Sequence, residues 1–222
     1  MAEIRSANIC FHGIGTACRE LEYGEDRFWI GIDAFRRILD EVVSWPDVRL
    51  SFDDGNSSDT EIALDELCER GLTATFFVLA GRLGGAGSLS ENDVSELCRR
   101  GMGIGTHGMD HRSWRGMDEA TRHRELVEAR QRISEIARVH IDEAALPLGQ
   151  YDRKLLADLR RLGYVAVHTS DRHPARRDAW LQPRFSVRVD HTPESLRSEA
   201  LGASTFGRRA FVAAKGVIKR LR

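Results

Sequence analysis

Short apolar runs alternate with amphipathic stretches along most of the chain. The runs are rich in β-branched and aromatic residues and predict buried strands at 7–11, 48–52, 73–79, 103–106, 144–146, 164–168 and 185–187. Between them, apolar residues recur at helical spacing, as at Phe35, Ile38, Leu39 and Val42. This alternation predicts an α/β fold in which most strands are parallel and are followed by a helix.

Polar residues mark where the predicted helices begin. Asp33 is the expected N-cap of the first helix, and either Ser58 or Asp59 is that of the second. Further helices are predicted at 90–100, after Asp118, at 153–162 and after Thr192, where Pro193 has its φ already set for a helix. A helix therefore follows most of the strands.

The length of 222 residues suits one domain with a sizeable core. A complete eightfold barrel typically needs about 250 residues. We therefore predict a distorted, incomplete (β/α) barrel of about seven parallel strands, with an open doubly wound sheet as the alternative. No glycine-rich phosphate-binding sequence follows the first strand, which disfavours a nucleotide-binding fold.

Composition and charge narrow the expected partners and compartment. Hydrophobic residues make up 41% of the chain and charged residues 30%, as in ordinary globular proteins. The net charge of -1 gives no general attraction for nucleic acid, so none is expected as a partner. The cysteines are too sparse for a disulfide scaffold, and we find no signal peptide and no apolar stretch of about 20 residues. We expect a cytoplasmic protein, with export in a complex or a misplaced start codon as alternatives.

The segment 207–222 differs from the rest of the chain because it contains six Lys or Arg residues and no acidic residue. Drawn as a helix, it has one apolar face, formed by Phe211, Ala214, Ile218 and Leu221, and one basic face. We expect 1–206 to form one domain and 207–222 a basic amphipathic helix. That helix packs on the domain or, alternatively, rests on an anionic membrane surface, which would make the protein membrane-associated.

Candidate catalytic groups follow three predicted strands. Asp53 and Asp54 end one strand, His107 and His111 follow another, and His12 follows the first. One carboxylate and two imidazoles form a three-ligand set that leaves positions open on a catalytic metal ion. The spare carboxylate could take a proton from a water molecule, which suits hydrolysis of an amide or ester. Alone, each element is more typical of a turn or of solvated histidines.

Two motifs then indicate a family. The sequence Ser51-Phe52-Asp53-Asp54-Gly55 resembles the T/S-F-D-D-G motif of polysaccharide deacetylases, also called carbohydrate esterase family 4 or the chitin-oligosaccharide deacetylase homology domain. Residues 107–111 resemble the H-S/T-x-x-H motif, with Gly108 in place of the usual Ser or Thr. The resemblance implies that Asp53 is the general base. It also implies that Asp54, His107 and His111 bind a divalent metal, most often Zn, with Co, Mn or Ni as alternatives.

A third motif, R-P-P-F/Y-G-x-Y-N, is similar to residues 145–152, in which Pro147, Gly149 and Tyr151 match. The resemblance implies that the amide of Leu148 helps to hold the oxyanion and that Tyr151 belongs to the substrate site. Ala145 stands where the family has the Arg that pairs with the base. We hypothesise that Arg184 supplies this cation from another strand.

The last two motifs are weaker. Residues 171–180 resemble a motif that ends in D-W, which implies that Trp180 forms a wall of the acetyl pocket; a core tryptophan is the alternative. The family's C-terminal apolar strand ending in His is absent, but residues 9–12 have that form at the N-terminus. The resemblance is therefore to a circularly permuted variant, with His12 as the general acid.

The resemblance implies that 1–206 is a polysaccharide-deacetylase-like catalytic domain with a TIM-barrel-like fold. The expected activity is metal-dependent removal of N-acetyl groups from a polysaccharide, oligosaccharide or glycolipid sugar, as in exopolysaccharide maturation. One alternative is hydrolysis of a non-sugar amide at the same site. Another is a catalytically decayed carbohydrate-binding protein, which Ala145 favours. The loop 13–28 either lines the substrate groove or only connects two elements. The sequence does not predict an oligomeric state.

Overall fold

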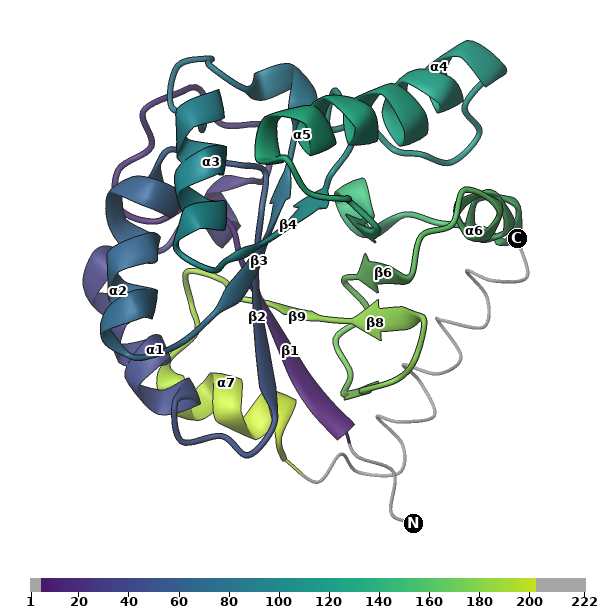
Figure 1. Cartoon of the computed structure of the whole chain (residues 1–222). Coiled ribbons are helices and arrows are strands. Elements are labelled where there is room, and N and C mark those ends of the chain that lie inside the picture. Colours follow the sequence, from purple (N-terminus) through teal and green to yellow (C-terminus); the bar gives the residue numbers. More distant parts are fainter. Residues whose placement is uncertain (1–4, 203–222) are drawn as a thin grey trace.

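The computed structural model describes residues 5–202 and contains one curled, mostly parallel sheet with helices outside it (Figure 1). The sheet order is β7-β1-β2-β3-β4-β5-β6-β8, and β9 also pairs with β1. The strands are β1 Arg5–Phe11, β2 Val48–Asp53, β3 Ala74–Val78, β4 Gly103–Thr106, β5 Glu143–Ala145, β6 Ala166–Thr169, β7 Ala175–Arg176, β8 Leu181–Pro183 and β9 Phe185–Ser186.

The segment formed by β8 and β9 nearly closes the barrel. β8 pairs in parallel with β6, while β9 pairs in parallel with β1. Across the remaining seam, Asn8 Nδ2 donates to Gln182 Oε1 at 2.9 Å and to the Pro183 carbonyl at 3.1 Å. The predicted distorted, incomplete barrel of about seven parallel strands is confirmed. The antiparallel β7 and the short β8 were not predicted, because such brief strands have no clear period.

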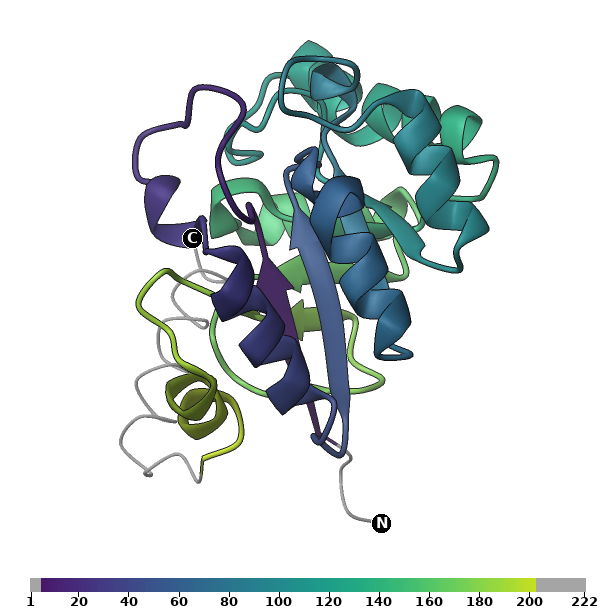
Figure 2. The same ribbon diagram turned by 90° about the vertical axis from the view of Figure 1, so that its left-hand side faces the viewer.

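The helices cover the outside of this sheet, as Figure 2 shows for α1 and α2 over β1 and β2. Their bounds are α1 Ile32–Val42, α2 Leu64–Glu69, α3 Glu91–Arg99, α4 Glu119–His123, α5 Ala129–Ala137, α6 Arg153–Arg161 and α7 Pro193–Ala200. π-helical turns at Asp59–Ala63 and Arg124–Glu128 precede α2 and α5. Short 3-10 turns lie at Asp26–Phe28, Ala80–Arg82 and Pro147–Gly149.

Side chains along each strand alternate between the apolar core under the helices and the interior of the barrel. Phe11, Phe52 and Phe76 stack on one another, at ring-centroid distances of 5.2 and 4.7 Å, and Phe35 of α1 lies against the first of them. Side chains on successive strand residues point to opposite faces. Ser51 and Asp53, on either side of Phe52, therefore face the interior, where a carboxylate can meet groups from other strands.

Four helices within residues 5–202 begin at a residue with a capping side chain; Asp152 caps α6, and the other three are helix starts that the sequence predicted. Ser90, Asp118 and Thr192 each accept a hydrogen bond from the backbone amide three residues later. Two expected caps are wrong. Gly31, not Asp33, is the N-cap of α1, and Ser58 has helical backbone angles without a capping bond. The Ser58 hydroxyl instead accepts from the Ile14 amide, because the loop after β1 lies against this turn.

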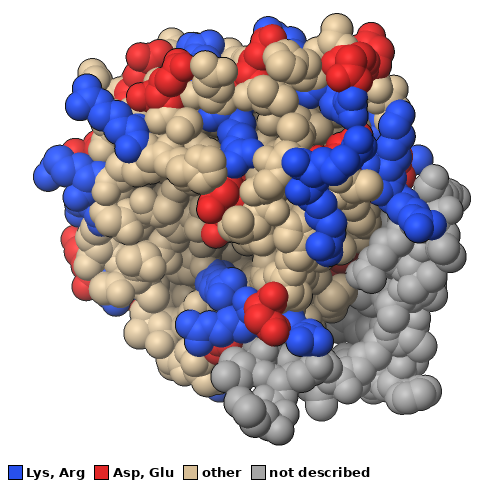
Figure 3. Space-filling model, turned by 45° about the vertical axis from the view of Figure 1, so that its right-hand side comes forward, with Lys and Arg blue, Asp and Glu red and all other residues tan. Residues whose placement is uncertain are grey.

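Charges of opposite sign lie close together on the surface. On the face shown in Figure 3, acidic side chains lie among the basic ones. Within residues 5–202, Arg122 pairs with Asp158 and Arg124 with Asp110, both at 2.9 Å. Such pairing neutralises charge locally, as expected for a chain with a net charge of -1.

The predicted basic helix 207–222 lies outside the described residues, and so does the proposed division at residue 206. Among the helices between residues 5 and 202, none has the length and apolar character needed to cross a membrane.

Candidate active site

Asp54, His107 and His111 converge at the carboxyl ends of β2 and β4. Asp54 Oδ1 lies 3.5 Å from His107 Nε2 and 3.3 Å from His111 Nε2. All three residues offer ligand atoms within 4.8 Å of one another. Asp54 and His111 have left-handed backbone angles, with φ of 76° and 48°. Such angles cost about 1–3 kcal/mol for residues other than glycine and tend to occur at functional sites.

The hydrogen bonds of both histidines leave Nε2 available as a ligand. His107 Nδ1 lies 2.9 Å from the Ala145 carbonyl, and His111 Nδ1 lies 2.8 Å from Glu22 Oε2. Because these oxygens accept, we assign the proton to Nδ1 and the lone pair to Nε2. Burial lowers the pKa of His107 to about 4, although the charges of Asp53 and Asp54 oppose this shift. His107 is therefore neutral near pH 7, as a metal ligand must be.

The surroundings of the Asp54 carboxylate show whether a metal ion fits between the three side chains. Its side chain is 2% exposed, and Oδ1 has no hydrogen-bond partner among residues 5–202. Burial raises the pKa of Asp54, but His12, His111 and His107 hold it below its ordinary value. A buried anionic oxygen facing two imidazole lone pairs is unfavourable unless a cation lies between them. The residues therefore fit a divalent ion, and this N₂O set suits zinc.

Asp53 lies beside this cluster and is paired with Arg184. The guanidinium donates to both Asp53 oxygens at 2.6 Å and to the Ser51 hydroxyl at 3.0 Å. Burial raises the pKa of Asp53, but the charge of Arg184, with smaller contributions from His107 and His12, holds it well below its usual range. A cation thus lies beside Asp53 although residue 145 is Ala. The carbonyl of Ala145 holds His107 instead.

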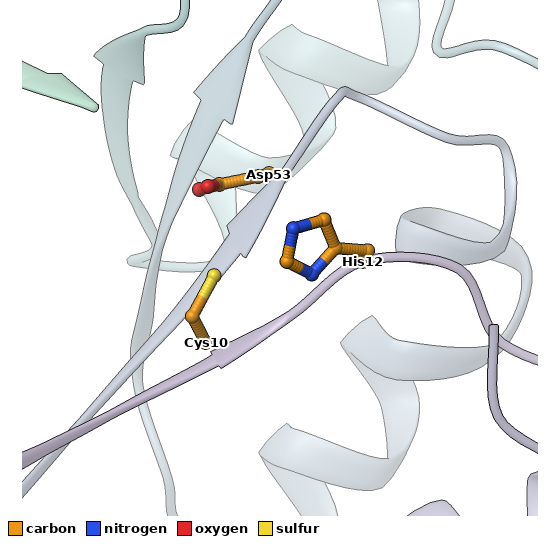
Figure 4. Close-up of side chains that lie close together, drawn as sticks. All are labelled: Cys10, His12 and Asp53. Atoms are coloured by element: carbon orange, nitrogen blue, oxygen red, sulfur yellow. The ribbon is translucent and has the colours of Figure 1, made fainter. Parts of the chain in front are cut away.

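His12, Cys10 and Asp53 form a second group of converging side chains (Figure 4). Their ligand atoms lie within 4.8 Å of one another, and the His12 ring stacks on Phe28. Two observations disfavour a resident ion in this group. Arg184 occupies both Asp53 oxygens, and burial raises the pKa of the Cys10 thiol well above its usual value. His12 and Asp53 are better suited to proton transfer.

The loop between β1 and α1 reaches the metal-ligand cluster. Besides contacting His111, Glu22 forms an ion pair with Arg82, and Arg19 pairs with Glu25 and hydrogen-bonds to Asn56. These contacts tie the loop to the segments after β2, β3 and β4. No sequence motif identified Glu22 as a partner of His111, because the two residues lie 89 positions apart.

The structure separates the residues predicted for the substrate site. Leu148 lies in the turn after β5, with φ of 57° and a side chain 55% exposed. Tyr151 is 1% exposed, belongs to the core, and donates its hydroxyl to Asp171 Oδ2 at 2.6 Å. Its ring is enclosed by apolar neighbours, and the expected contact of Tyr151 with substrate stays a prediction.

Trp180 lies apart from the other candidate site residues. It directly precedes β8, and its indole N–H donates to the Tyr164 carbonyl, before β6, at 2.7 Å. The Arg160 guanidinium lies 4.3 Å from the Trp180 ring centroid. Both neighbours lie near the amino ends of parallel strands, whereas Asp54 lies at the carboxyl end. Trp180 therefore packs on α6, at the end of the barrel opposite Asp54, and its expected role as a wall of the acetyl pocket stays a prediction.

A separate cavity of about 340 Å³ opens toward the amino ends of the strands. Its polar lining includes His168, which pairs with Glu143 at 2.8 Å, and one side of Arg184. The three candidate metal ligands do not line it. The candidate active site and this cavity therefore lie at opposite ends of the barrel.

Comparison with known proteins identifies the family to which the chain belongs. Residues 42–167 match the family described as polysaccharide deacetylase. YxkH of Bacillus subtilis (strain 168), named as a polysaccharide deacetylase, is 24% identical over 160 residues, or 72% of this chain and 54% of YxkH. This chain thus spans about half the length of that relative.

Two solved structures share the fold. The Streptococcus pyogenes deacetylase PplD in complex with acetate has a TM-score of 0.79 and 18% identity, covering 90% of this chain and 99% of PplD. A de-N-acetylase from Aggregatibacter actinomycetemcomitans has a TM-score of 0.74 and 12% identity. The match covers 88% of this chain and 100% of that chain. At these identities the matches establish the fold of the barrel.

Proposed function

Because this chain belongs to the polysaccharide deacetylase family, we propose that it is a divalent-metal-dependent hydrolase of N-acetylated sugars. The substrate would be a polysaccharide, an oligosaccharide or a glycolipid, with exopolysaccharide as one source. One observation carries this proposal. A buried carboxylate oxygen that has no hydrogen-bond partner within residues 5–202 faces two imidazole nitrogens, directly beside a second, ionised carboxylate.

Asp54, His107 and His111 would hold the ion, with Zn as the first choice and Co, Mn or Ni as alternatives. An ion bound there supplies a Lewis acid that polarises the acetyl carbonyl and lowers the pKa of a nearby water. Glu22 and the Ala145 carbonyl keep both imidazoles in the required tautomer. These partners also orient each ring toward Asp54.

Asp53 would take the proton from the attacking water. Arg184 keeps the carboxylate ionised and fixes its plane through two hydrogen bonds, so it is available as an acceptor over the whole working pH range. The amide of Leu148, in the turn after β5, would donate to the oxyanion that develops on the acetyl oxygen. His12 would give a proton to the departing sugar nitrogen. Water and amide are thereby converted to acetate and a free amine.

The decayed carbohydrate-binding alternative depended on the loss of an Arg at residue 145. The ion pair between Arg184 and Asp53 weakens that argument, because a cation is present beside the base. Hydrolysis of a non-sugar amide uses the same groups and stays as the second candidate. The match to the polysaccharide deacetylase family favours the first candidate.

The test is acetate release from N-acetylglucosamine oligomers by the zinc-loaded chain. Asp53→Asn should lower the rate by about 100-fold or more, because loss of a general base costs about 10²–10⁴. Asp65→Asn is the matched control, since Asp65 is exposed on α2 and pairs with Arg100. Wild-type rates in Asp53→Asn would refute the assignment of the base. Acetate release from small amides but not from the oligomers would favour the second candidate.

A further inference from the structure

Glu125 lies outside all of the motifs that identify the site, in the π-helical turn before α5. We propose that Glu125 is a positioning residue whose carboxylate fixes the loop 107–111 and thereby sets the affinity for the metal ion. This inference rests on the proposed function, because it assumes that His107 and His111 are ligands.

The Glu125 carboxylate is the common acceptor for the loop. Its side chain is buried, with 0% exposure. Oε2 accepts from the Met109 amide at 2.8 Å and from the Trp114 indole at 3.2 Å, while Oε1 accepts from the Asp110 amide at 3.3 Å. One buried carboxylate therefore holds the two residues that precede His111.

The opposite edge of the same loop is fixed by a different segment. The Ala80 amide donates to the Gly108 carbonyl and the Gly81 amide to the Met109 carbonyl, both at 2.9 Å. The carbonyls are thus satisfied by the turn after β3, and Glu125 satisfies the amides. With φ of 90° at Gly108 and 48° at His111, the loop has an unusual course that these two sets of bonds maintain.

Glu125 also accounts for the glycine at residue 108. A Cβ atom there would lie 2.4 Å from Glu125 Oε2 and 2.9 Å from Trp114 Nε1. The carboxylate and the indole thus occupy the space of a side chain at residue 108. The short polar side chain that the family motif carries at this position is absent, and a carboxylate from a helix 17 residues later binds the loop in its place.

Zinc affinity is the direct readout, measured by competition with a chromophoric chelator. Glu125→Gln keeps the volume but replaces one acceptor oxygen by an N–H donor that faces other donors. Affinity should fall by about 10–100-fold, the usual cost of losing an outer partner of a metal ligand. The matched control is Glu128→Gln, because Glu128 lies on the same helical turn, is exposed, and pairs with the exposed His123 at 3.7 Å. Its affinity should match that of the wild type.

The outcomes separate this inference from the proposed function. If the wild type binds no metal, the proposed function fails. If the wild type binds zinc and folded Glu125→Gln binds it as tightly, only the role of Glu125 is wrong. Should Glu125→Gln not fold, Trp114→Phe decides, since it removes one donor to the carboxylate and keeps an aromatic ring. It should shift the visible absorption of the Co-substituted protein and weaken metal binding several-fold, and an unchanged spectrum and affinity would overturn the inference.

Discussion

Arg184 donates through both terminal guanidinium nitrogens to the two oxygens of Asp53, from a position 131 residues later in the chain. The contact arises from topology. β9 pairs with β1 and β1 with β2, so the residue just before β9 enters the interior two strands away from Asp53. The cation beside Asp53 thus comes from the segment that closes the barrel, while residue 145 is Ala.

Replacing Arg184 by Met should shift the acid limb of the pH profile of kcat/KM to higher pH. In the wild type, Arg184 keeps the pKa of Asp53 far below the pH values at which activity is measured. In the variant, burial and the neighbouring Asp54 charge raise that pKa, so activity is lost as pH falls through the new value. A profile with the same acid limb would refute the pairing role.

The same substitution should also cost stability in a pH-dependent way. Removing one partner of a buried pair costs about 3–5 kcal/mol. Because the folded-state pKa of Asp53 is lowered, the pair contributes fully above the unfolded pKa of about 3.9 and loses its contribution as pH falls toward the folded value. Denaturant unfolding of wild type and variant should therefore converge in acid. A constant difference from pH 3 to pH 7 would contradict this.

Asp59 should destabilise the metal-free fold as pH rises. Its side chain is buried, and among residues 5–202 neither carboxylate oxygen has a hydrogen-bond partner. Burial, followed by the charges of Asp54 and Asp53, raises the pKa of Asp59 well above its usual value. The folded state therefore keeps a proton that the unfolded state has lost, and stability declines as pH rises from about 4 through the folded pKa.

Asp59→Asn removes this titration. Unfolding of the chelator-treated chain should show the variant gaining about 1.4 kcal/mol relative to the wild type for each pH unit between pH 5 and the folded pKa of Asp59, because the amide has no proton to lose. Parallel stability curves over that range would show that Asp59 has a partner or is not buried in solution.

Gly108→Ala should be far more damaging than Gly116→Ala. Both glycines have positive φ, 90° and 67°, which costs about 1–2 kcal/mol for Ala. Only at residue 108 would the Cβ also meet other atoms, Glu125 Oε2 and Trp114 Nε1; at Gly116 nothing lies within 4 Å. Thermal unfolding and zinc affinity should both decline clearly more for Gly108→Ala. Equal losses of stability and zinc affinity in the two variants would indicate that the positive φ alone explains why residue 108 is Gly.

Trp180→Phe tests whether Trp180 acts in the substrate site or only in packing. The substitution removes the hydrogen bond to the Tyr164 carbonyl, so stability should fall by about 1 kcal/mol while kcat/KM for the glycan stays within about twofold. A large rise in KM with unchanged stability would restore Trp180 to the substrate site.

Local sequence patterns were sufficient to predict the site residues that lie together in one short segment. Asp53 and Asp54 end a strand, and His107 and His111 share one loop, so their convergence followed from the rule that parallel strands end at one edge. The barrel followed from repeated strand–helix units. Arg184 could be proposed only as a substitute cation, because β8 and β9 are too short to reveal their register from sequence.

Other features depend on contacts that no local pattern encodes. Glu22 and Glu125 reach the histidine loop from 89 and 16 positions away, and neither belongs to a motif. The motif match at Trp180 could not show that this residue directly precedes β8 and so lies at the amino end of a strand. Tyr151 matched its motif, yet its hydroxyl is used within the core.

The most direct test is to strip the chain with a chelator, titrate it with Zn²⁺, and measure bound metal and acetate release from N-acetylglucosamine oligomers in the same samples. We predict no activity in the stripped chain, one tightly bound ion per chain, and a rate that rises in proportion to the zinc occupancy. We also predict that Asp54→Asn neither binds the ion tightly nor releases acetate. A stripped chain that still releases acetate at the full rate would contradict the account.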